Sequence, residues 1–267
     1  MAKKDFTAVV LAGERPSPAA DPLASAAGVA SKVLVPVAGI AVIQRVLDNI
    51  ERCDRFEKRI LVGPTAATLA AVPGLPNRID SGTWTWLAPA RTPAASSSAA
   101  LEIIGTDGPV LLTTADHAFM TAEILDYFCS EALATGADFA VGFARRKDVL
   151  KMFPGTRRTG WRFRDDTYCG CNLFAVLRPA GHSVTAFWQL VEAERKRPWR
   201  IMQMLGAGLL VRYLARRLTL ADALNELGNR TQCRIASVVL SQSEAAVDVD
   251  SIDDWRLVNE SWARLRG

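Results

Sequence analysis

The sequence predicts an α/β fold built on a mostly parallel central sheet. Short β-rich runs alternate with helix-like segments through the first half of the chain. These runs are apolar throughout instead of alternating in polarity, as expected for strands covered on both faces. At 267 residues, with 49% hydrophobic and 22% charged residues, the chain suffices for one large domain or two small ones. We expect one domain over residues 1–267.

The first half should follow a strand–helix–strand order. The expected strands cover residues 8–11, 59–62, 83–87, 110–113 and 139–143. The expected helices cover residues 42–51, 65–71, 96–104 and 122–135. Ligands of open parallel sheets bind outside the carboxyl ends of the strands. Gly13 and Asp116 each follow an apolar run directly, so we expect them at the same edge of the sheet.

The second half of the chain has a different character. Residues 148–166 are basic and polar, 173–177 resemble a strand, and 184–227 form a long arginine-containing helical stretch. A strand at 235–240 and a final helix at 252–265, with Ser251 as its N-cap, complete the pattern. We therefore expect a basic, helix-rich insert at about 145–233.

Charge and cysteine content limit the class of protein. A net charge of +4 fits phosphorylated or other anionic partners and is too small to indicate nucleic acid. Five cysteines without zinc-ligand spacing indicate a reducing compartment. The sequence shows neither a signal peptide nor a run of about 18 apolar residues. We expect a cytoplasmic protein that does not span a membrane.

The strongest functional signal lies between residues 7 and 47. The apolar run 8–11 is followed by Gly13, a loop of small residues with Arg15, and then Lys32 beside a second apolar run. Backbone N–H groups of a glycine-containing turn can point at phosphate oxygens, and the two cations can neutralise them. The dinucleotide fingerprint and the P-loop pattern are both absent. The alternative is a surface loop with two solvated cations.

Carboxylates follow two further apolar runs. Asp116 could hold Mg²⁺ through one direct bond, or cap a helix near Thr121, which is itself the better cap. Asp248 and Asp250 would share one face of a strand, where two like charges favour a nearby cation. The alternative is that one of them caps the last helix.

A serine-rich segment follows the third expected strand. Arg91 precedes Ser96 and Ser98 at the start of a helix, where hydroxyls and an arginine could form a pocket for a base or a phosphate. An ordinary serine N-cap explains the same pattern equally well.

Together these elements resemble the MobA-like nucleotidyltransferase family. The family opens with L-A-A/G-G-x-x-x-R, matched here by residues 11–13 and Arg15, and has an aspartate in V-L-x-x-x-D-x-P, matched by Asp116. Its second motif, P-K-x-L-x-P-V-x-G-x-P-x-I, is matched by Lys32, Leu34, Pro36, Val37, Gly39 and Ile43. Its closing motif, D-x-D-T-P-E-D-L, is matched by Asp248, Asp250 and Asp254. The sequence departs from the pattern at Glu14, Ser31, Ala118 and Ile252.

The resemblance implies a Rossmann-like, three-layer, GT-A-like nucleotidyltransferase fold. It implies transfer of a nucleoside monophosphate from an NTP to a phosphorylated small-molecule acceptor, with release of pyrophosphate. It implies Mg²⁺ at Asp116 and Asp250, with Asp248 as the substitute second ligand, and a triphosphate held by Arg15 and Lys32. The implied nucleotide-binding residues are Leu11, Ala12, Gly13, Arg91, Ser96 and Ser98. Acceptor binding falls to the insert, through Arg157, Arg158 and Arg162.

Other interpretations stay open. A GT-A-type glycosyltransferase could use Asp248-Val249-Asp250 as its metal motif, and a catalytically silent nucleotide-binding protein would suit the departure at Glu14. The segment 198–224 mixes apolar runs, arginines and aromatic residues. It could contact the inner face of a membrane peripherally, form a homodimer interface, or cover the acceptor.

Overall fold

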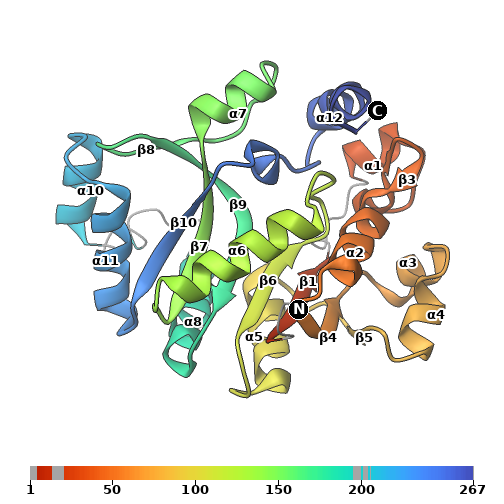
Figure 1. Ribbon diagram of the computed structural model, residues 1–267, viewed down its shortest axis with the longest axis horizontal. Helices are drawn as coiled ribbons and strands as arrows, with labels where there is room; N and C mark the ends of the chain where they lie inside the picture. Colours follow the sequence, from red (N-terminus) through yellow and green to blue (C-terminus); the bar gives the residue numbers. More distant parts are fainter. Residues whose placement is uncertain (1–4, 14–20, 195–199, 201–203, 205, 267) are drawn as a thin grey trace.

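The structure, a computed structural model, describes residues 5–13, 21–194, 200, 204 and 206–266. Within these residues an eight-stranded, mostly parallel sheet lies between helices on both faces (Figure 1). The predicted α/β class and Rossmann-like architecture are confirmed. The sheet order is β10-β7-β9-β6-β1-β4-β5, with β8 paired to β9. A separate hairpin joins β2 and β3.

Strands β1, β4, β5, β6, β7 and β10 lie close to the predicted ranges, whereas β9 begins six residues before the predicted 173–177, and β2, β3 and β8 were not predicted. They are β1 (Phe6–Leu11), β2 (Pro36–Val37), β3 (Ile40–Ala41), β4 (Phe56–Val62), β5 (Thr85–Leu87), β6 (Val110–Thr114), β7 (Phe139–Arg145), β8 (Trp161–Arg162), β9 (Thr167–Val176) and β10 (Ile235–Leu240).

The helices cover the sheet and its edges. They are α1 (Pro22–Ala26), α2 (Val42–Arg52), α3 (Ala66–Ala71), α4 (Leu75–Asp80), α5 (Pro93–Ile104), α6 (Ala122–Ala134), α7 (Arg146–Met152), α8 (His182–Ala193), α10 (Ala207–Leu214), α11 (Leu220–Thr231) and α12 (Ile252–Arg266). Short 3-10 turns cover Lys32–Leu34, Pro179–Gly181 and Ser243–Ala246.

Each face of the sheet has its own apolar core. Val10 faces the core shared with α2, α6 and α12, whereas its neighbour Val9 faces the core shared with α5 and α11. Successive side chains of a strand point to opposite faces, so a strand covered on both sides must be apolar at every position. This explains the continuous apolar runs in the sequence.

The strand order reverses at β1. The chain runs from β1 to β4 and β5 on one side, and β6 lies on the other side of β1. In parallel α/β sheets such a reversal leaves a crevice at the carboxyl ends of the central strands. The loops after β1, β4 and β6 therefore meet at one edge of the sheet.

Two predictions about the second half were wrong. The long helix expected at 184–227 is divided in the described residues into α8, α10 and α11. Residues 247–250 contain no strand. The segment expected to be a helix-rich insert also supplies β9, which lies between β6 and β7 and pairs antiparallel with both. Its ten residues therefore belong to the interior of the sheet.

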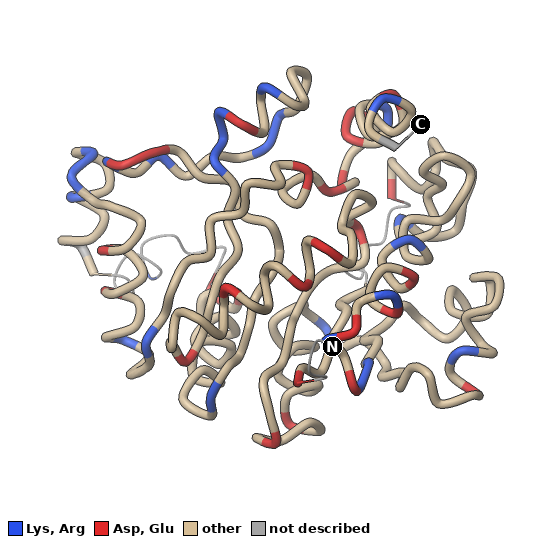
Figure 2. Tube along the Cα trace, viewed as in Figure 1, with Lys and Arg blue, Asp and Glu red and all other residues tan. Residues whose placement is uncertain are grey.

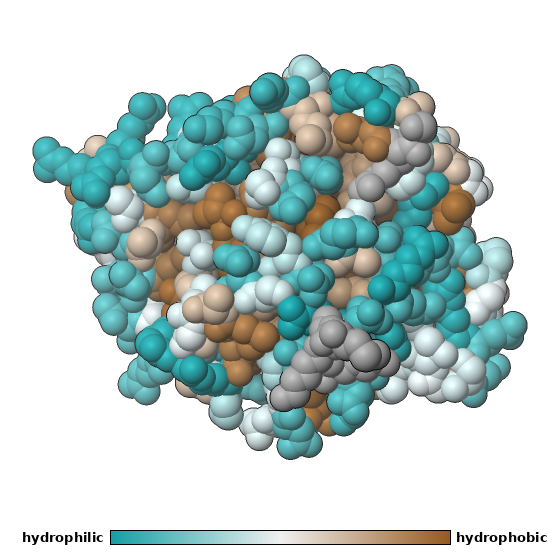
Figure 3. All heavy atoms as spheres, in the orientation of Figure 1, coloured by the Kyte–Doolittle hydropathy of each residue, from teal (hydrophilic) through white to brown (hydrophobic). Residues whose placement is uncertain are grey.

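The surface is mixed in character. Hydrophilic side chains cover most of the face shown in Figure 3, and smaller apolar areas lie between them. Lys and Arg gather along α7, β8 and the start of the loop that follows α10 (Figure 2). No described helix combines the length and apolarity that a membrane-spanning segment requires.

Candidate active site

The candidate site is built on the aligned carboxyl ends of β1, β4 and β6. The N–H of Ala115 donates to the carbonyl of Leu11 over 3.0 Å, and the N–H of Ala12 donates to the carbonyl of Val62 over 2.8 Å. The backbone after β1 is thus held between the loops of its two neighbours. As predicted, Gly13 and Asp116 lie at the same edge.

The loop at Gly13 packs against backbone with no room to spare. A Cβ atom added at Gly63 would lie 2.8 Å from the Gly13 nitrogen, and one added at Gly13 would lie 3.0 Å from Cβ of Pro89. Gly63 also has a φ of 78°, which favours glycine. The residues that begin the expected phosphate loop are therefore held rigidly in place.

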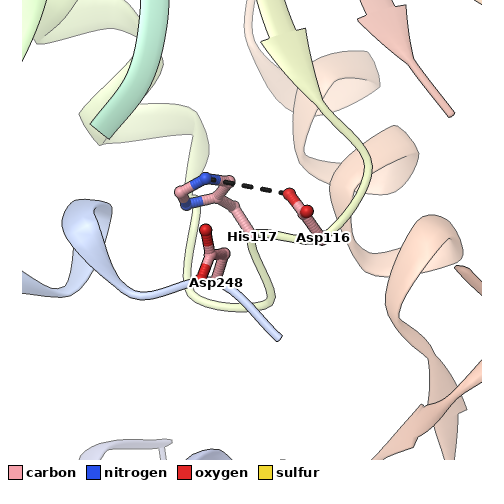
Figure 4. A group of neighbouring side chains, drawn as sticks. All are labelled: Asp116, His117 and Asp248. Atoms are coloured by element: carbon pink, nitrogen blue, oxygen red, sulfur yellow. Dashed lines mark ion pairs between the residues drawn. The ribbon is translucent and has the colours of Figure 1, made fainter. Parts of the chain in front are cut away.

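Three side chains converge beyond the end of β6. Asp116 and His117 come from the loop after β6, and Asp248 comes from the segment before α12 (Figure 4). Each offers one ligand atom, and these atoms lie within 4.8 Å of one another. The N–H of Val249 donates to the carbonyl of Asp116 over 2.9 Å, which ties the two segments together. Thr114 donates its hydroxyl to Asp116 over 2.6 Å.

Asp248 is the most strongly perturbed member of this cluster. Its residue is only 7% exposed. Burial and the neighbouring charge of Asp116 raise its pKa, against the opposing effects of His117 and Arg158. Arg158 donates to Asp248 and forms an ion pair with it. Burial would lower the pKa of Arg158, but the charge and hydrogen bond of Asp248, together with the nearby Cys169 and Asp116, raise it on balance. Arg158 therefore stays protonated in this contact.

His117 is a fully buried member of the cluster. Its Nε2 lies 2.9 Å from the side-chain nitrogen of Asn172 and 3.8 Å from Oδ1 of Asp116. Its Nδ1 is buried and makes no hydrogen bond to any described residue. Asn172 has a φ of 49°, in the left-handed region, although it lies inside β9. Asn172 thus leaves regular strand geometry at the position where its amide reaches His117.

Lys32 lies between two carboxylates on the other side of Asp116. Its Nζ is 2.8 Å from Oδ1 of Asp250 and 4.0 Å from Oδ2 of Asp116. Burial would lower the pKa of Lys32, but the charges of Asp116 and Asp250 outweigh it and raise the pKa. Lys32 therefore stays protonated at neutral pH. The side chain of Asp250 is 66% exposed, so Asp248 and Asp250 occupy different environments.

The cluster has the composition that a divalent cation requires. Two carboxylates and an imidazole, all at least largely buried, bring negative charge and an unused nitrogen into one small volume. Like charges at this spacing repel unless a cation lies between them. Carboxylate oxygens are the ligands that Mg²⁺ takes in proteins, usually one or two of them together with phosphate oxygens. The residues present therefore fit a divalent metal.

The serine segment lies next to the same edge. The hydroxyl of Ser96 accepts from the N–H of Ala90 over 3.0 Å, so it anchors the loop that follows β5. Thr92 caps α5 by accepting from the N–H of Ala95. Ser96 is buried, Ser98 is half-buried and Arg91 is exposed. The structure therefore assigns the capping role to Thr92 rather than to a serine.

The remaining predicted residues lie farther from the acidic cluster or outside the described residues. Arg157 is exposed and pairs with Asp253 over 3.2 Å. Arg162 lies in β8 and donates its backbone N–H to Tyr213. Arg15 and Glu14 lie outside the described residues. Of the three insert arginines, Arg158 is the one in contact with the acidic cluster.

Sequence reasoning assigned no function to His117 and Asn172. His117 directly follows Asp116, so its place in the same strand-end loop was a signal for it. Asn172 gave no such signal, because an asparagine in an apolar stretch does not by itself indicate a left-handed residue. The position of Asn172 beside His117 depends on β9 lying next to β6.

Solved structures of other proteins have a fold similar to that of this chain. A hypothetical transferase from Thermus thermophilus is 25% identical, with a TM-score of 0.76 over 94% of this chain and 99% of that one. A 4-diphosphocytidyl-2C-methyl-D-erythritol synthase from Anaerococcus prevotii is 13% identical, with a TM-score of 0.60 over 98% and 97% of the two chains. A CMP:2-keto-3-deoxy-manno-octonic acid synthetase complexed with CTP is 10% identical, with a TM-score of 0.56 over 97% and 99%. The last two show a shared fold.

No curated protein sequence matches the chain significantly. The sequence profile of the MobA-like NTP transferase domain matches residues 8–235, a range that includes the segment 145–233. The match, the sheet order and the acidic cluster beyond β6 agree with one another. The chain therefore belongs to the MobA-like NTP transferase domain family.

Proposed function

We propose that this protein is a magnesium-dependent nucleotidyltransferase. It transfers a nucleoside monophosphate from an NTP to a phosphorylated small molecule and releases pyrophosphate. The observation that carries the proposal is the meeting of Asp116, Asp248 and Lys32 at the carboxyl edge of the sheet, beside the loop at Gly13. Family membership supports the transfer of a nucleotide in general.

The metal ligands in this proposal are Asp116 and Asp248, with Asp250 next to them. When bound, Mg²⁺ neutralises the phosphate oxygens and the charge that develops on the leaving pyrophosphate. The grouping of Asp248 with Asp116 supports it, rather than Asp250, as the second ligand. The predicted pair of Asp116 and Asp250 is thereby modified. Thr114 orients the Asp116 carboxylate through its hydroxyl.

The protein's own groups position the reactants. Lys32, protonated at neutral pH, holds the triphosphate and stabilises the leaving pyrophosphate. The backbone at Ala12 and Gly13, which the β4 loop holds in place, is the proposed support for the nucleotide at this edge of the sheet. Holding both reactants in line supplies much of the rate in such reactions, because the protein performs no covalent step.

Arg158 is the proposed ligand of the acceptor phosphate. Its guanidinium lies at the acidic cluster with its side chain 19% exposed, so it can meet a small anion that enters there. Guanidinium groups bind phosphate through two parallel hydrogen bonds. Arg157 and Arg162 are more exposed, and they stay secondary candidates for the acceptor's outer parts.

Asp116→Ala should abolish transfer while the fold survives. We expect at least about a hundredfold loss of turnover, because a metal-holding carboxylate acts on the transition state. The measurement is pyrophosphate release with a panel of NTPs and phosphorylated acceptors. The matched control is Asp107→Ala, which removes an exposed carboxylate just before β6 begins. Near wild-type turnover of the Asp116 variant would make the metal assignment wrong.

The pyrophosphate assay also separates the alternatives. A glycosyltransferase would release a nucleotide from a nucleotide sugar and no pyrophosphate. A silent nucleotide-binding protein would bind an NTP without turnover.

Peripheral membrane contact and dimer formation stay predictions for the segment 198–224. The described part of this segment includes α10, whose Val211 and Leu214 are 63% and 71% exposed. Co-sedimentation with anionic vesicles at low salt and size-exclusion chromatography test the two predictions separately.

A further inference from the structure

The acidic cluster already holds a cation of the protein's own. Arg158, from the loop between α7 and β8, contacts Asp248, and Asp248 is one of the three residues whose ligand atoms lie within 4.8 Å. A metal on Asp248 and the guanidinium of Arg158 would compete for the same carboxylate. Arg158 therefore neutralises part of the cluster's negative charge, although the proposed function requires it at the acceptor phosphate.

Not all hydrogen-bond donors of the Arg158 guanidinium have an acceptor in this contact. The Nε of Arg158 is buried and makes no hydrogen bond to any described residue. One terminal nitrogen of its guanidinium lies at the long distance of 3.4 Å from the carbonyl of Gly170. A guanidinium has five N–H donors, so Asp248 uses only part of its capacity. A buried donor without an acceptor is costly, and an anion that supplied acceptors would relieve that cost.

Lys32 makes a similar contact with carboxylates on the other side of Asp116. Its ammonium lies 2.8 Å from Asp250 and 4.0 Å from Asp116. Lys32 and Arg158, the two cations proposed to bind phosphates, therefore both form ion pairs with carboxylates near the proposed metal site. Two separate segments show the same pairing, which argues against an incidental contact.

We propose that Arg158 serves as an exchangeable counter-ion: it holds Asp248 while the metal is absent, and passes to the acceptor's anionic group once a divalent cation takes Asp248. This inference rests on the proposed function, because it presupposes the metal at Asp116 and Asp248. The exchange breaks no covalent bond. It breaks one ion pair, between Arg158 and Asp248, and forms two, one between Asp248 and the metal and one between Arg158 and the anion. Metal and acceptor therefore strengthen each other's binding, and this coupling is reciprocal.

The first test measures metal affinity alone, with Mn²⁺ as the probe in titration calorimetry of the full chain. Arg158→Gln should bind Mn²⁺ about tenfold more tightly than wild type, because Asp248 no longer spends most of its time paired. Arg157→Gln is the matched control: it removes the same charge one residue away, from a side chain that pairs with Asp253 at the surface. Its affinity should stay within about twofold of wild type.

A second test measures the anion, with sulfate as the probe. Mg²⁺ should raise the affinity of wild type and of Arg157→Gln for sulfate, and the gain should be several-fold smaller in Arg158→Gln. Where Arg158→Gln does not fold, Arg158→Lys replaces it. The lysine keeps the charge and loses the fork of donors, so its Mn²⁺ affinity should lie above that of wild type by about threefold.

The outcomes separate the inference from the proposed function. Equal Mn²⁺ affinity in Arg158→Gln and Arg157→Gln overturns the exchange, even if wild type transfers nucleotides. Tighter Mn²⁺ binding by Arg158→Gln supports the exchange, even if no NTP and acceptor pair is turned over.

Discussion

Single residues at this site depart from the geometry of the elements that carry them. Asn172 adopts a left-handed φ of 49° inside β9, and its amide lies 2.9 Å from Nε2 of the buried His117. Left-handed geometry is costly for residues with a Cβ, and asparagine bears it better than most. Strained residues persist where the surrounding structure holds them, often at functional sites.

Replacing Asn172 separates its backbone role from its side-chain role. Asn172→Gly and Asn172→Ala both remove the amide that reaches His117. We expect the alanine variant to be less stable than the glycine variant by about 1 kcal/mol, because alanine carries the left-handed strain and glycine does not. Urea denaturation measures the difference. Equal stabilities would contradict the left-handed assignment.

The residues missed by sequence reasoning were those that depend on the fold. Asp116 and Lys32 could be predicted because each follows or adjoins an apolar run. Asp248 was expected only as the substitute for Asp250 as second ligand, and both were expected on one strand face. Residues 247–250 form no strand, and Asp248 turns inward to Arg158 while Asp250 stays exposed. Local sequence does not encode that choice, since it depends on distant partners.

At the level of elements, the loops after β1 and β4 depend on each other. A Cβ at Gly63 would lie 2.8 Å from the nitrogen and 2.9 Å from Cα of Gly13, and both are backbone atoms. Backbone cannot rotate away as the end of a side chain can. The conformation of the Gly13 loop is therefore set partly by a residue of the neighbouring loop.

Gly63→Ala should displace the Gly13 loop. Gly74→Ala is the matched control, because Gly74 has a similar φ of 74° and nothing within 4 Å of the added Cβ. Both variants carry left-handed strain, so the excess effect of Gly63→Ala isolates the clash. We expect Gly63→Ala to be less stable than Gly74→Ala by about 1–3 kcal/mol, the usual cost of overpacking. Its KM for NTP should rise at least about tenfold. Identical behaviour of the two variants would show that the loop is not confined.

The start of α11 is held by a capping box with a defined pH dependence. Asp222 donates its N–H to the hydroxyl of Thr219, and hydrogen bonds from Thr219 together with the charge of Arg212 lower the pKa of Asp222 below 3.8. The ionised carboxylate is thus the form that stabilises the fold. That contribution is complete above the unfolded value and is lost as the pH falls through the lowered pKa.

Asp222→Asn should therefore destabilise the protein by a constant amount from pH 7 to pH 5, and by less below about pH 4. Urea denaturation of both proteins across this range measures the difference. A difference that changes between pH 7 and pH 5 would assign the effect to another group.

At the scale of the whole molecule, one ligand would join parts of the chain that are far apart in sequence. The loop after β1, the loop after β6 and the segment before α12 meet at the site. Only the folded chain assembles them. Mg²⁺ with its preferred NTP at a concentration of about 100 times Kd should therefore add about 2.7 kcal/mol to the free energy of unfolding. Calorimetry measures this shift. Asp116→Ala should show a smaller one.

The overall architecture could be predicted because each part of the pattern is local. Continuous apolar runs separated by helices indicate a covered parallel sheet, and β10 begins and ends as expected at 235–240. The first half of β9 was missed because Gly170 and Asn172, which disfavour strands, interrupt it. The long helical stretch was overextended: α10 ends at Leu214, and Arg216 has a left-handed φ of 55° before α11 begins at Leu220. Tertiary packing decided both cases.

The antiparallel strand β9 has a consequence for the growing polypeptide. Once β1, β4, β5 and β6 have left the ribosome they can pair with one another, but the outer edge of β6 has no neighbour until residues 167–176 emerge. β7 waits for the same residues on one side, and for residues 235–240 on the other. Unpaired strand edges promote aggregation. A nascent chain stalled before residue 167 should therefore bind chaperones, and one released after residue 240 should not.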